Sequence, residues 1–111
     1  MKSIYLFIVF VLSLAFNCLS QQRYLEKEVT MDHDTMFLKI DMHKLSGVVY
    51  NEHGEIGVFK NGLRDGIHKE WFRNGNLKDE ISYSNGLKDG EFRYWDDKGQ
   101  LLKEGHYIKN N

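Results

Sequence analysis

The chain has 111 residues and a formal charge of −1, with 28% charged and 14% aromatic residues. This length allows one domain, and the composition is typical of a folded protein rather than a disordered one. Because there is no basic excess and no polybasic run, the sequence excludes a nucleic-acid-binding protein and a protein held on anionic membranes by charge.

Residues 1–20 predict a secretory signal peptide. Lys2 supplies a positive start, residues 4–16 are almost entirely apolar, and the small residues Cys18 and Ser20 lie at positions −3 and −1 of a cleavage site before Gln21. The apolar stretch is short for a membrane-spanning helix, which needs roughly 20 residues, and an uncleaved anchor is the alternative. We therefore expect an exported protein, periplasmic or extracellular, without stable membrane insertion after cleavage.

Cys18 is the single cysteine of the chain. A lipoprotein cut before Cys18, with the lipid on its thiol, is a second alternative, although Phe16 and Asn17 are larger than the residues such a site prefers. Cleavage before Gln21 leaves a mature chain without cysteine. That chain has no disulfide, no thiol nucleophile and no thiolate metal site.

Residues 21–45 form an N-terminal lead-in segment in which the sequence predicts one strand, at residues 36–40. The segment holds possible metal ligands at Asp32, His33 and Asp34, and again at Asp41 and His43. A structural zinc site needs four ligands in tetrahedral geometry, and sulfur ligands are absent here. A solvated acidic loop is therefore the favoured interpretation, and we expect no metal and no cofactor.

Residues 46–111 repeat themselves with an offset of 24 positions. Phe59–Gly66 returns as Tyr83–Gly90, and Tyr50–Ile56 resembles Trp71–Leu77 at an offset of 21. The further matches at offset 24 are Trp71 with Trp95, Gly75 with Gly99, Leu77 with Leu101, Glu80 with Glu104 and Tyr83 with Tyr107. A period in this range predicts stacked supersecondary units with atypical units at the ends.

Each unit is predicted to be a β-hairpin. Asn-Gly pairs at residues 61–62, 74–75 and 85–86 predict two-residue turns, because both residue types tolerate positive φ. The segments between them are rich in aromatic and β-branched residues, and no proline interrupts them. The sequence thus predicts an all-β fold, an elongated and twisted antiparallel sheet of tandem hairpins.

The alternation of residues along the strands predicts one apolar and one solvated face. Ile67 and Trp71 are expected on the core face, and His68 and Glu70 on the solvated face. In the next strand the expected core residues are Leu77, Ile81 and Tyr83.

Comparison of the two copies suggests a binding surface on the predicted solvated face. His68, Glu70 and Lys78 of the first copy correspond to Phe92, Tyr94 and Leu102 of the second. An apolar cluster on a solvated face marks either a contact site or a second buried layer. Adjacent strand residues face opposite ways, so at least one of Trp71 and Phe72 must leave the core face. Exposed aromatic residues beside an arginine, here Arg93 next to Tyr94, are typical of protein-recognition surfaces. The predicted partner-binding residues are Phe92, Tyr94, Leu102, Phe72 and Arg93.

Catalysis is not expected. The serines of the mature part lie outside nucleophile motifs, and Asp65 and Asp89 precede glycines at turn positions. Glu80 and Glu104 recur at offset 24, and we expect them to pair with a lysine or a backbone donor of an adjacent strand. A cell-envelope enzyme or sugar-binding protein that uses the aromatic residues as a stacking platform is the competing class.

The pattern formed by residues 61–66, 71–77, Glu80 and 83–86 resembles the bacterial MORN-repeat variant, whose members are often labelled YwqK-type antitoxin components. The resemblance covers about Leu45 to Tyr107, including the lead-in strand at residues 45–50. It implies a β-hairpin repeat sheet that acts as a protein-binding surface. We therefore expect an exported protein-binding or scaffold module with a protein partner. The alternative is an antitoxin-like or immunity-like inhibitor of a toxin or effector protein.

Overall fold

The computed structural model describes residues 22–109, and the predicted signal peptide lies outside this range. The elements in chain order are β1 (Arg23–Leu25), the 3-10 turn η1 (Glu26–Glu28), β2 (Val29–Asp32), β3 (Thr35–Leu38), β4 (Gly47–Asn51), β5 (Gly54–Lys60), β6 (Leu63–Trp71), β7 (Leu77–Ser84), β8 (Leu87–Trp95) and β9 (Leu101–Tyr107). Across residues 22–109 no helix has the length and apolar character needed to cross a bilayer.

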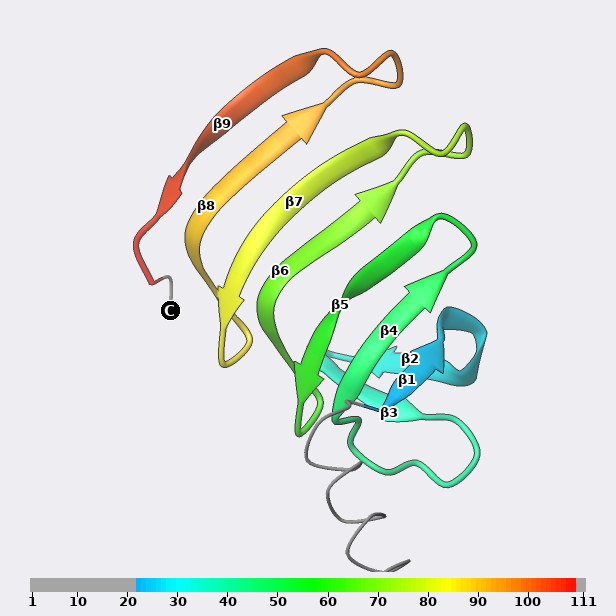
Figure 1. Cartoon of the computed structure of the whole chain (residues 1–111). Helices are drawn as coiled ribbons and strands as arrows, with labels where there is room; N and C mark the ends of the chain where they lie inside the picture. Colours follow the sequence, from blue (N-terminus) through cyan, green and yellow to red (C-terminus); the bar gives the residue numbers. More distant parts are fainter. Residues whose placement is uncertain (1–21, 110–111) are drawn as a thin grey trace, which may run out of the picture.

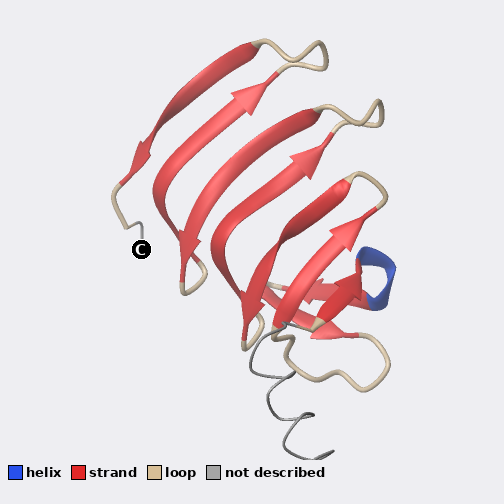
Figure 2. Ribbon diagram, in the orientation of Figure 1, coloured by secondary structure: helices blue, strands red, loops and turns tan. Residues whose placement is uncertain are grey.

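The prediction of an all-β repeat sheet is confirmed (Figures 1 and 2). Seven strands form one sheet in the order β1-β4-β5-β6-β7-β8-β9, and β2 and β3 form a separate two-stranded sheet. Strands β4 to β9 pair antiparallel with their sequence neighbours, whereas β1 pairs parallel with β4. The described chain measures 63 × 33 × 26 Å, so the hairpins stack along one long axis, as expected for a repeat protein.

Two-residue turns connect β5 to β6 and β7 to β8. Asn61 and Gly62 have φ values of 49° and 82°, and Asn85 and Gly86 have 50° and 84°. Positive φ at both central residues is the requirement of the type I′ turn, which explains the Asn-Gly pairs. The Gly86 amide also donates to the carbonyl of Arg64 at 2.8 Å, so successive turns on this side of the sheet are joined by backbone hydrogen bonds.

Five-residue turns, 72–76 and 96–100, connect the strands at the opposite end, so the prediction of a two-residue turn at Asn74-Gly75 was wrong, and only Gly75 of that pair has a positive φ. In each turn, the first residue's amide donates to the last residue's carbonyl, at 2.8 and 2.9 Å, and the fourth residue, glycine, has a φ of 90°. The side-chain amide of Asn74 donates to the backbone carbonyl of Asp97 at 2.7 Å, and that of Asn76 donates to the same oxygen at 2.9 Å. The turns of the two units are therefore tied to one another, not only the strands.

The lead-in segment contains more structure than the sequence predicted. One strand was expected at residues 36–40, but this region forms β1, η1 and the β2–β3 hairpin, and β3 ends at Leu38. The hairpin packs on the sheet through Val29, which joins Leu45, Val49 and Phe59 in the core cluster. Polar residues between the apolar ones hide this pattern in the sequence, because only one side of a two-stranded hairpin needs to be apolar.

The sheet has two faces, which we call inner and outer. The inner face carries Phe59, His68, Ile81 and Phe92, and the β2–β3 hairpin packs against it. The outer face carries the alternate residues, which include Ile67, Lys69, Glu80, Arg93 and Glu104.

The predicted assignment of faces in β6 was wrong. His68 is 6% exposed, whereas Ile67 is 56% exposed. The register explains the difference, because His68 lies opposite Ile81, and the bulge between Glu70 and Trp71 helps to set that register. Pairing thus places the polar positions of β6 beside the apolar positions of β7, which alternation within one strand does not reveal.

Candidate binding surface

Aromatic residues of β7, β8 and β9 gather on the inner face. Phe92 is 9% exposed, and its ring centroid lies 4.6 Å from that of Tyr107 and 5.7 Å from that of Tyr94. Its ring also lies over Gly105, where an added Cβ would come within 2.6 Å of a ring carbon. Glycine at position 105 therefore provides the space in which Phe92 packs.

The hydroxyl of Tyr94 lies in this aromatic group. Burial raises the pKa of Tyr94 to about 12, and a hydrogen bond with Tyr107 acts in the same direction. Tyr94 is thus neutral at physiological pH and presents a hydroxyl that donates and accepts hydrogen bonds.

Cations lie over several of the aromatic rings. The Arg64 guanidinium is 5.3 Å from the ring centroid of Tyr83, the Lys88 ammonium is 5.2 Å from that of Tyr107, and the Lys103 ammonium is 5.7 Å from that of Phe92. Such pairs contribute about 0.5–1 kcal/mol each at exposed sites. The surface therefore combines aromatic rings with positive charge.

His68 occupies the buried end of the same face. Its Nε2 lies 2.7 Å from the carbonyl oxygen of Val58, which fixes the proton on Nε2 as the donor, and its ring meets those of Phe59 and Tyr83 edge-on. Burial lowers the pKa of His68. A neutral ring engaged in this way acts as part of the packing, and its Nε2 is not free to serve as a general base.

Asp79 is a buried carboxyl group on the inner face. It lies between Glu70 of β6 and Tyr94 of β8 in the register of the sheet. Burial and then the neighbouring charge of Glu70 raise the pKa of Asp79 to about 6, although Lys78 acts in the opposite direction. Lys78 also forms an ion pair with Glu70 at 3.7 Å. The group contains two carboxyls and one ammonium without an ordered ligand geometry.

A cavity of about 130 Å³ lies where the β2–β3 hairpin ends and the uncovered part of the inner face begins. Its lining comes from the hairpin through Met31 and Met36 and from the sheet through residues that include His68, Asp79 and Tyr83. This volume is sufficient for a single side chain of a partner but small for a drug-sized ligand.

The predicted partner-binding residues do not form one patch. Phe92 and Tyr94 lie side by side on the inner face, but Phe92 is packed, so the expectation that it faces solvent was wrong. Arg93 lies on the outer face, paired with Glu104 at 3.5 Å and Glu91 at 3.1 Å. Whether these residues bind a partner stays a prediction.

The other two predicted residues lie at the end of the sheet where the five-residue turns are. Phe72 belongs to the turn 72–76, where its amide donates a hydrogen bond to the carbonyl oxygen of Asn76. Leu102 is skipped in the pairing of β8 with β9 and is 67% exposed.

Sequence reasoning assigned Tyr83 to the core and did not include Tyr107 or Asp79 in a binding surface. Two sequence signals could have found the tyrosines. Tyr83 repeats as Tyr107 at offset 24, and Tyr94 lies in the strand between them. Three tyrosines on one face of adjacent strands place hydroxyl groups beside apolar rings. That combination is typical of a surface that contacts another molecule.

The outer face carries a row of alternating charges across four strands. Lys69 lies opposite Glu80, Glu80 opposite Arg93, and Arg93 opposite Glu104. Glu104 pairs with Arg93 of the adjacent strand, rather than with the lysine or backbone donor that was expected. Cross-strand pairs of opposite charge contribute roughly 0.2–1 kcal/mol each and help to fix the register.

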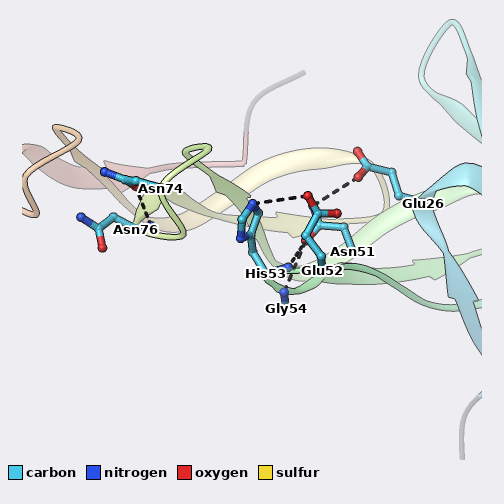
Figure 3. A network of polar contacts seen from close by, with 7 residues as sticks. All are labelled: Glu26, Asn51, Glu52, His53, Gly54, Asn74 and Asn76. Carbon is cyan, nitrogen blue, oxygen red and sulfur yellow. Dashed lines mark hydrogen bonds and ion pairs between the residues drawn. The ribbon is translucent and has the colours of Figure 1, made fainter.

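Polar side chains line the end of the sheet that carries the five-residue turns (Figure 3). The Asn51 side chain accepts from the amides of His53 and Gly54 and donates to Glu26, and His53 contacts Glu52 at 3.6 Å. These contacts hold turns in place.

Histidine–carboxylate pairs also occur in the lead-in segment. His33 lies 2.9 Å from Asp32, and His43 lies 2.8 Å from Asp41. Among residues 22–109 there is no group of three or more His, Cys, Asp or Glu side chains placed to hold a metal ion.

Residues 64–85 and 88–109 match the MORN repeat variant family. The two matched segments begin 24 positions apart, so they reproduce the period of the sequence, and they correspond to most of β6–β7 and β8–β9. No curated protein and no solved structure matches the chain.

Proposed function

We propose that this chain, which carries two MORN repeat variant units, is an exported protein-binding or scaffold module without catalytic activity. Its partner is a protein, and the contact surface is the part of the inner face formed by β7, β8 and β9. Tyr83, Tyr94 and Tyr107 provide the contacts around the packed ring of Phe92.

The observation that carries this proposal is the unequal cover of the inner face. The β2–β3 hairpin packs over β4, β5 and β6, and it contacts the sheet as far as β6. In Figure 1 no described segment lies over β8 and β9. The uncovered part still carries the aromatic residues that a buried face would have.

The chemistry of the uncovered part favours a protein partner. Tyrosine is enriched in protein interfaces because it buries a large apolar area and still satisfies a polar group. Tyr94 is neutral and offers a hydroxyl, while Lys88 and Lys103 lie beside the rings. The adjacent cavity of about 130 Å³ provides a place for one anchoring side chain of the partner.

Two narrower parts of the proposal rest on the sequence. Export is supported by the positive and apolar character of residues 1–20. An antitoxin-like inhibitor of one toxin or effector is the narrower alternative, supported by the resemblance to YwqK-type proteins. The number of partners distinguishes it from a scaffold.

Site-specific photo-crosslinking tests the proposed surface. A photoreactive phenylalanine analogue is placed at Tyr94 on the inner face and, as the control, at the exposed outer-face residue Ile67. We expect crosslinked protein from position 94 and little from position 67, with the product lost when Tyr107→Ala is added.

The identity of the captured material separates the remaining alternatives. A single dominant partner favours the inhibitor, and several envelope proteins favour the scaffold. Equal capture from positions 67 and 94, or capture of glycans only, would contradict the proposed surface.

A further inference from the structure

The two edge strands of the sheet differ in length. At the N-terminal end the edge strand is β1, which has only three residues, pairs parallel with β4 and is followed by η1; short edge strands offer little backbone for pairing. At the C-terminal end the edge strand is the seven-residue β9, which among residues 22–109 pairs only with β8, and Leu101 through His106 are all exposed. A strand of this kind presents unpaired backbone amides and carbonyls, which favour pairing with another strand.

We infer that β9 pairs antiparallel with β9 of a second copy of this chain, with the two-fold axis at Gly105. This inference does not depend on the proposed function of the inner face. The argument comes from the charges and side-chain sizes of residues 103–107, which fit this register better than the neighbouring symmetric ones.

Symmetry limits the possible registers. In an antiparallel pair related by a two-fold axis perpendicular to the sheet, residues that lie opposite one another point to the same face. Side chains alternate between the faces, so opposite residues are an even number of positions apart, and the axis lies between the two copies of one residue. An axis at Glu104 would oppose two glutamates, and an axis at Lys103 would oppose two lysines. An axis at His106 would leave Glu104 opposite the apolar Ile108.

Within residues 103–107, the register centred on Gly105 places complementary side chains opposite one another. Glu104 lies opposite His106 of the second copy, and this pair occurs twice because of the symmetry. Lys103 lies opposite Tyr107 of the second copy, on the inner face, where a cation and an aromatic ring attract one another. Gly105 opposite Gly105 brings no steric conflict above the ring of Phe92, which already occupies the space over it.

This register also continues the charge row of the outer face. Within one chain the row runs Lys69, Glu80, Arg93 and Glu104, with alternating sign, and it ends at the open edge. In the dimer the next residue of the row after Glu104 is His106 of the second copy. Within each copy, His106 lies opposite Glu91 of β8. The row therefore crosses the interface without two like charges meeting.

Exposed apolar residues flank the pairing segment. Leu102 is 67% exposed, and Ile108 is 87% exposed. Leu102 is the bulged residue before the pairing segment and Ile108 follows it, so the two-fold axis brings Leu102 of one copy and Ile108 of the other to the same end, where both lose contact with water. A single strand pair buries less area than a standard interface, so we expect a dimer that forms at micromolar or higher concentration.

Charge exchange at positions 104 and 106 tests the register by analytical ultracentrifugation. The purified protein is measured between about 10 and 500 µM, a range suited to a small interface. We expect the wild type to approach twice the monomer mass. His106→Glu places two glutamates opposite one another in each pair and weakens association by about tenfold or more.

Recombination of the charges provides the specific result. Glu104→Lys alone also weakens self-association, but an equal mixture of the Glu104→Lys and His106→Glu proteins restores dimers, because each Lys–Glu and His–Glu pair is then complementary. The double variant E104K/H106E dimerises on its own. Lys69→Glu, which changes the same charge row far from β9, leaves the association unchanged and serves as the control.

Hydrogen exchange of the wild-type protein provides a second measurement that needs no variant. Amides of β9 that do not bond β8 gain protection as the concentration rises, whereas amides of β6 do not change. A wild type that stays monomeric to about 500 µM, or a dimer that is unaffected by both single changes, would overturn the inference. A monomer whose β9 is protected only by another protein would show that the edge takes a different strand, and would overturn it equally.

Discussion

His68 in the first repeat unit and Phe92 in the second lie at the same point of the repeat, yet their surroundings differ. His68 lies at the end of the inner face that the β2–β3 hairpin covers, and its Nε2 bonds the Val58 carbonyl. Phe92 lies where the face is uncovered, and its partners are two tyrosines and a glycine. The repeat thus fixes the strands and turns, while the residues of the inner face vary with what lies over them.

Turn glycines should show the largest difference between the covered and uncovered ends. Gly62 has a φ of 82°, and a Cβ there would collide with Thr35 Cγ2 and lie 2.9 Å from the Met36 carbonyl oxygen. Gly62→Val therefore adds a clash with the hairpin to the strain of positive φ, and we expect it to unfold a domain of this size.

Gly99 provides the matched comparison, because its φ is 90° and nothing lies within 4 Å of an added Cβ. Gly99→Val should cost only the backbone strain, about 1–3 kcal/mol. Denaturant unfolding followed by circular dichroism measures both variants. Equal losses would mean that the hairpin does not rest on the Gly62 turn.

Asp79 should destabilise the fold at neutral pH, whereas Lys103, its counterpart 24 positions later, is solvated. Since the pKa of Asp79 is raised to about 6, the folded state keeps the carboxyl neutral where the unfolded chain ionises near 3.8. Wild-type stability attributable to this group is therefore present below about pH 4 and lost as the pH rises to about 6.

Asp79→Asn should thus raise the free energy of unfolding at pH 7 by about 1–3 kcal/mol and leave it nearly unchanged at pH 3.5. Urea unfolding at the two pH values checks this. A gain of the same size at both would exclude the ionisation of Asp79 as the cause.

Replacement of His68 by phenylalanine makes the first unit resemble the second. Burial lowers the pKa of His68, so the unfolded chain takes up a proton at higher pH than the folded protein. Wild-type stability due to this residue is present above about pH 6.5 and decreases as the pH falls below it. In His68→Phe that decrease should be absent.

At pH 7 the loss of the bond to the Val58 carbonyl should cost His68→Phe about 1 kcal/mol. Thermal melts of both proteins between pH 5 and 7.5 follow the effect. Parallel pH curves would show that His68 takes up its proton equally in both states.

Tyr94→Ala should have the smallest effect on stability. Tyr94 belongs to β8, over which no described segment lies in Figure 1, and it lies beside Phe92, so its truncation should cost about 1 kcal/mol or less. The melting temperature measures this effect. Phe59→Ala is the matched control, because it removes a covered ring of the core cluster and should cost about 3–5 kcal/mol. Comparable losses for the two would mean that the face is packed at both ends.

The repeat and its turns could be predicted from the sequence because they depend on local chemistry. Asn61-Gly62 and Asn85-Gly86 specify their turns by φ alone, and the hairpins follow. The buried face could not be predicted in the same way. It depends on the register of β6 with β7 and on the β2–β3 hairpin, and both are contacts between segments distant in sequence.

The candidate surface was predictable only in part for the same reason. Comparison of the copies found Phe92 and Tyr94, because these positions differ between units. It grouped them with Leu102, Arg93 and Phe72, which a β-bulge, the outer face and a turn place elsewhere. Differences between copies identify variable positions, whereas the pleat and bulges decide which of them meet.

Hydroxyl-radical footprinting of the purified wild-type protein tests most directly whether the inner face is covered over β4–β6 and uncovered over β7–β9. Phe59, which is 2% exposed, should be oxidised slowly, whereas Tyr94 and Tyr107 should be oxidised many times faster after correction for the intrinsic reactivity of each residue type. Protection of Tyr94 and Tyr107 as strong as that of Phe59 in dilute, monomeric protein would contradict the account, because it would mean that the face proposed to bind a partner is already covered.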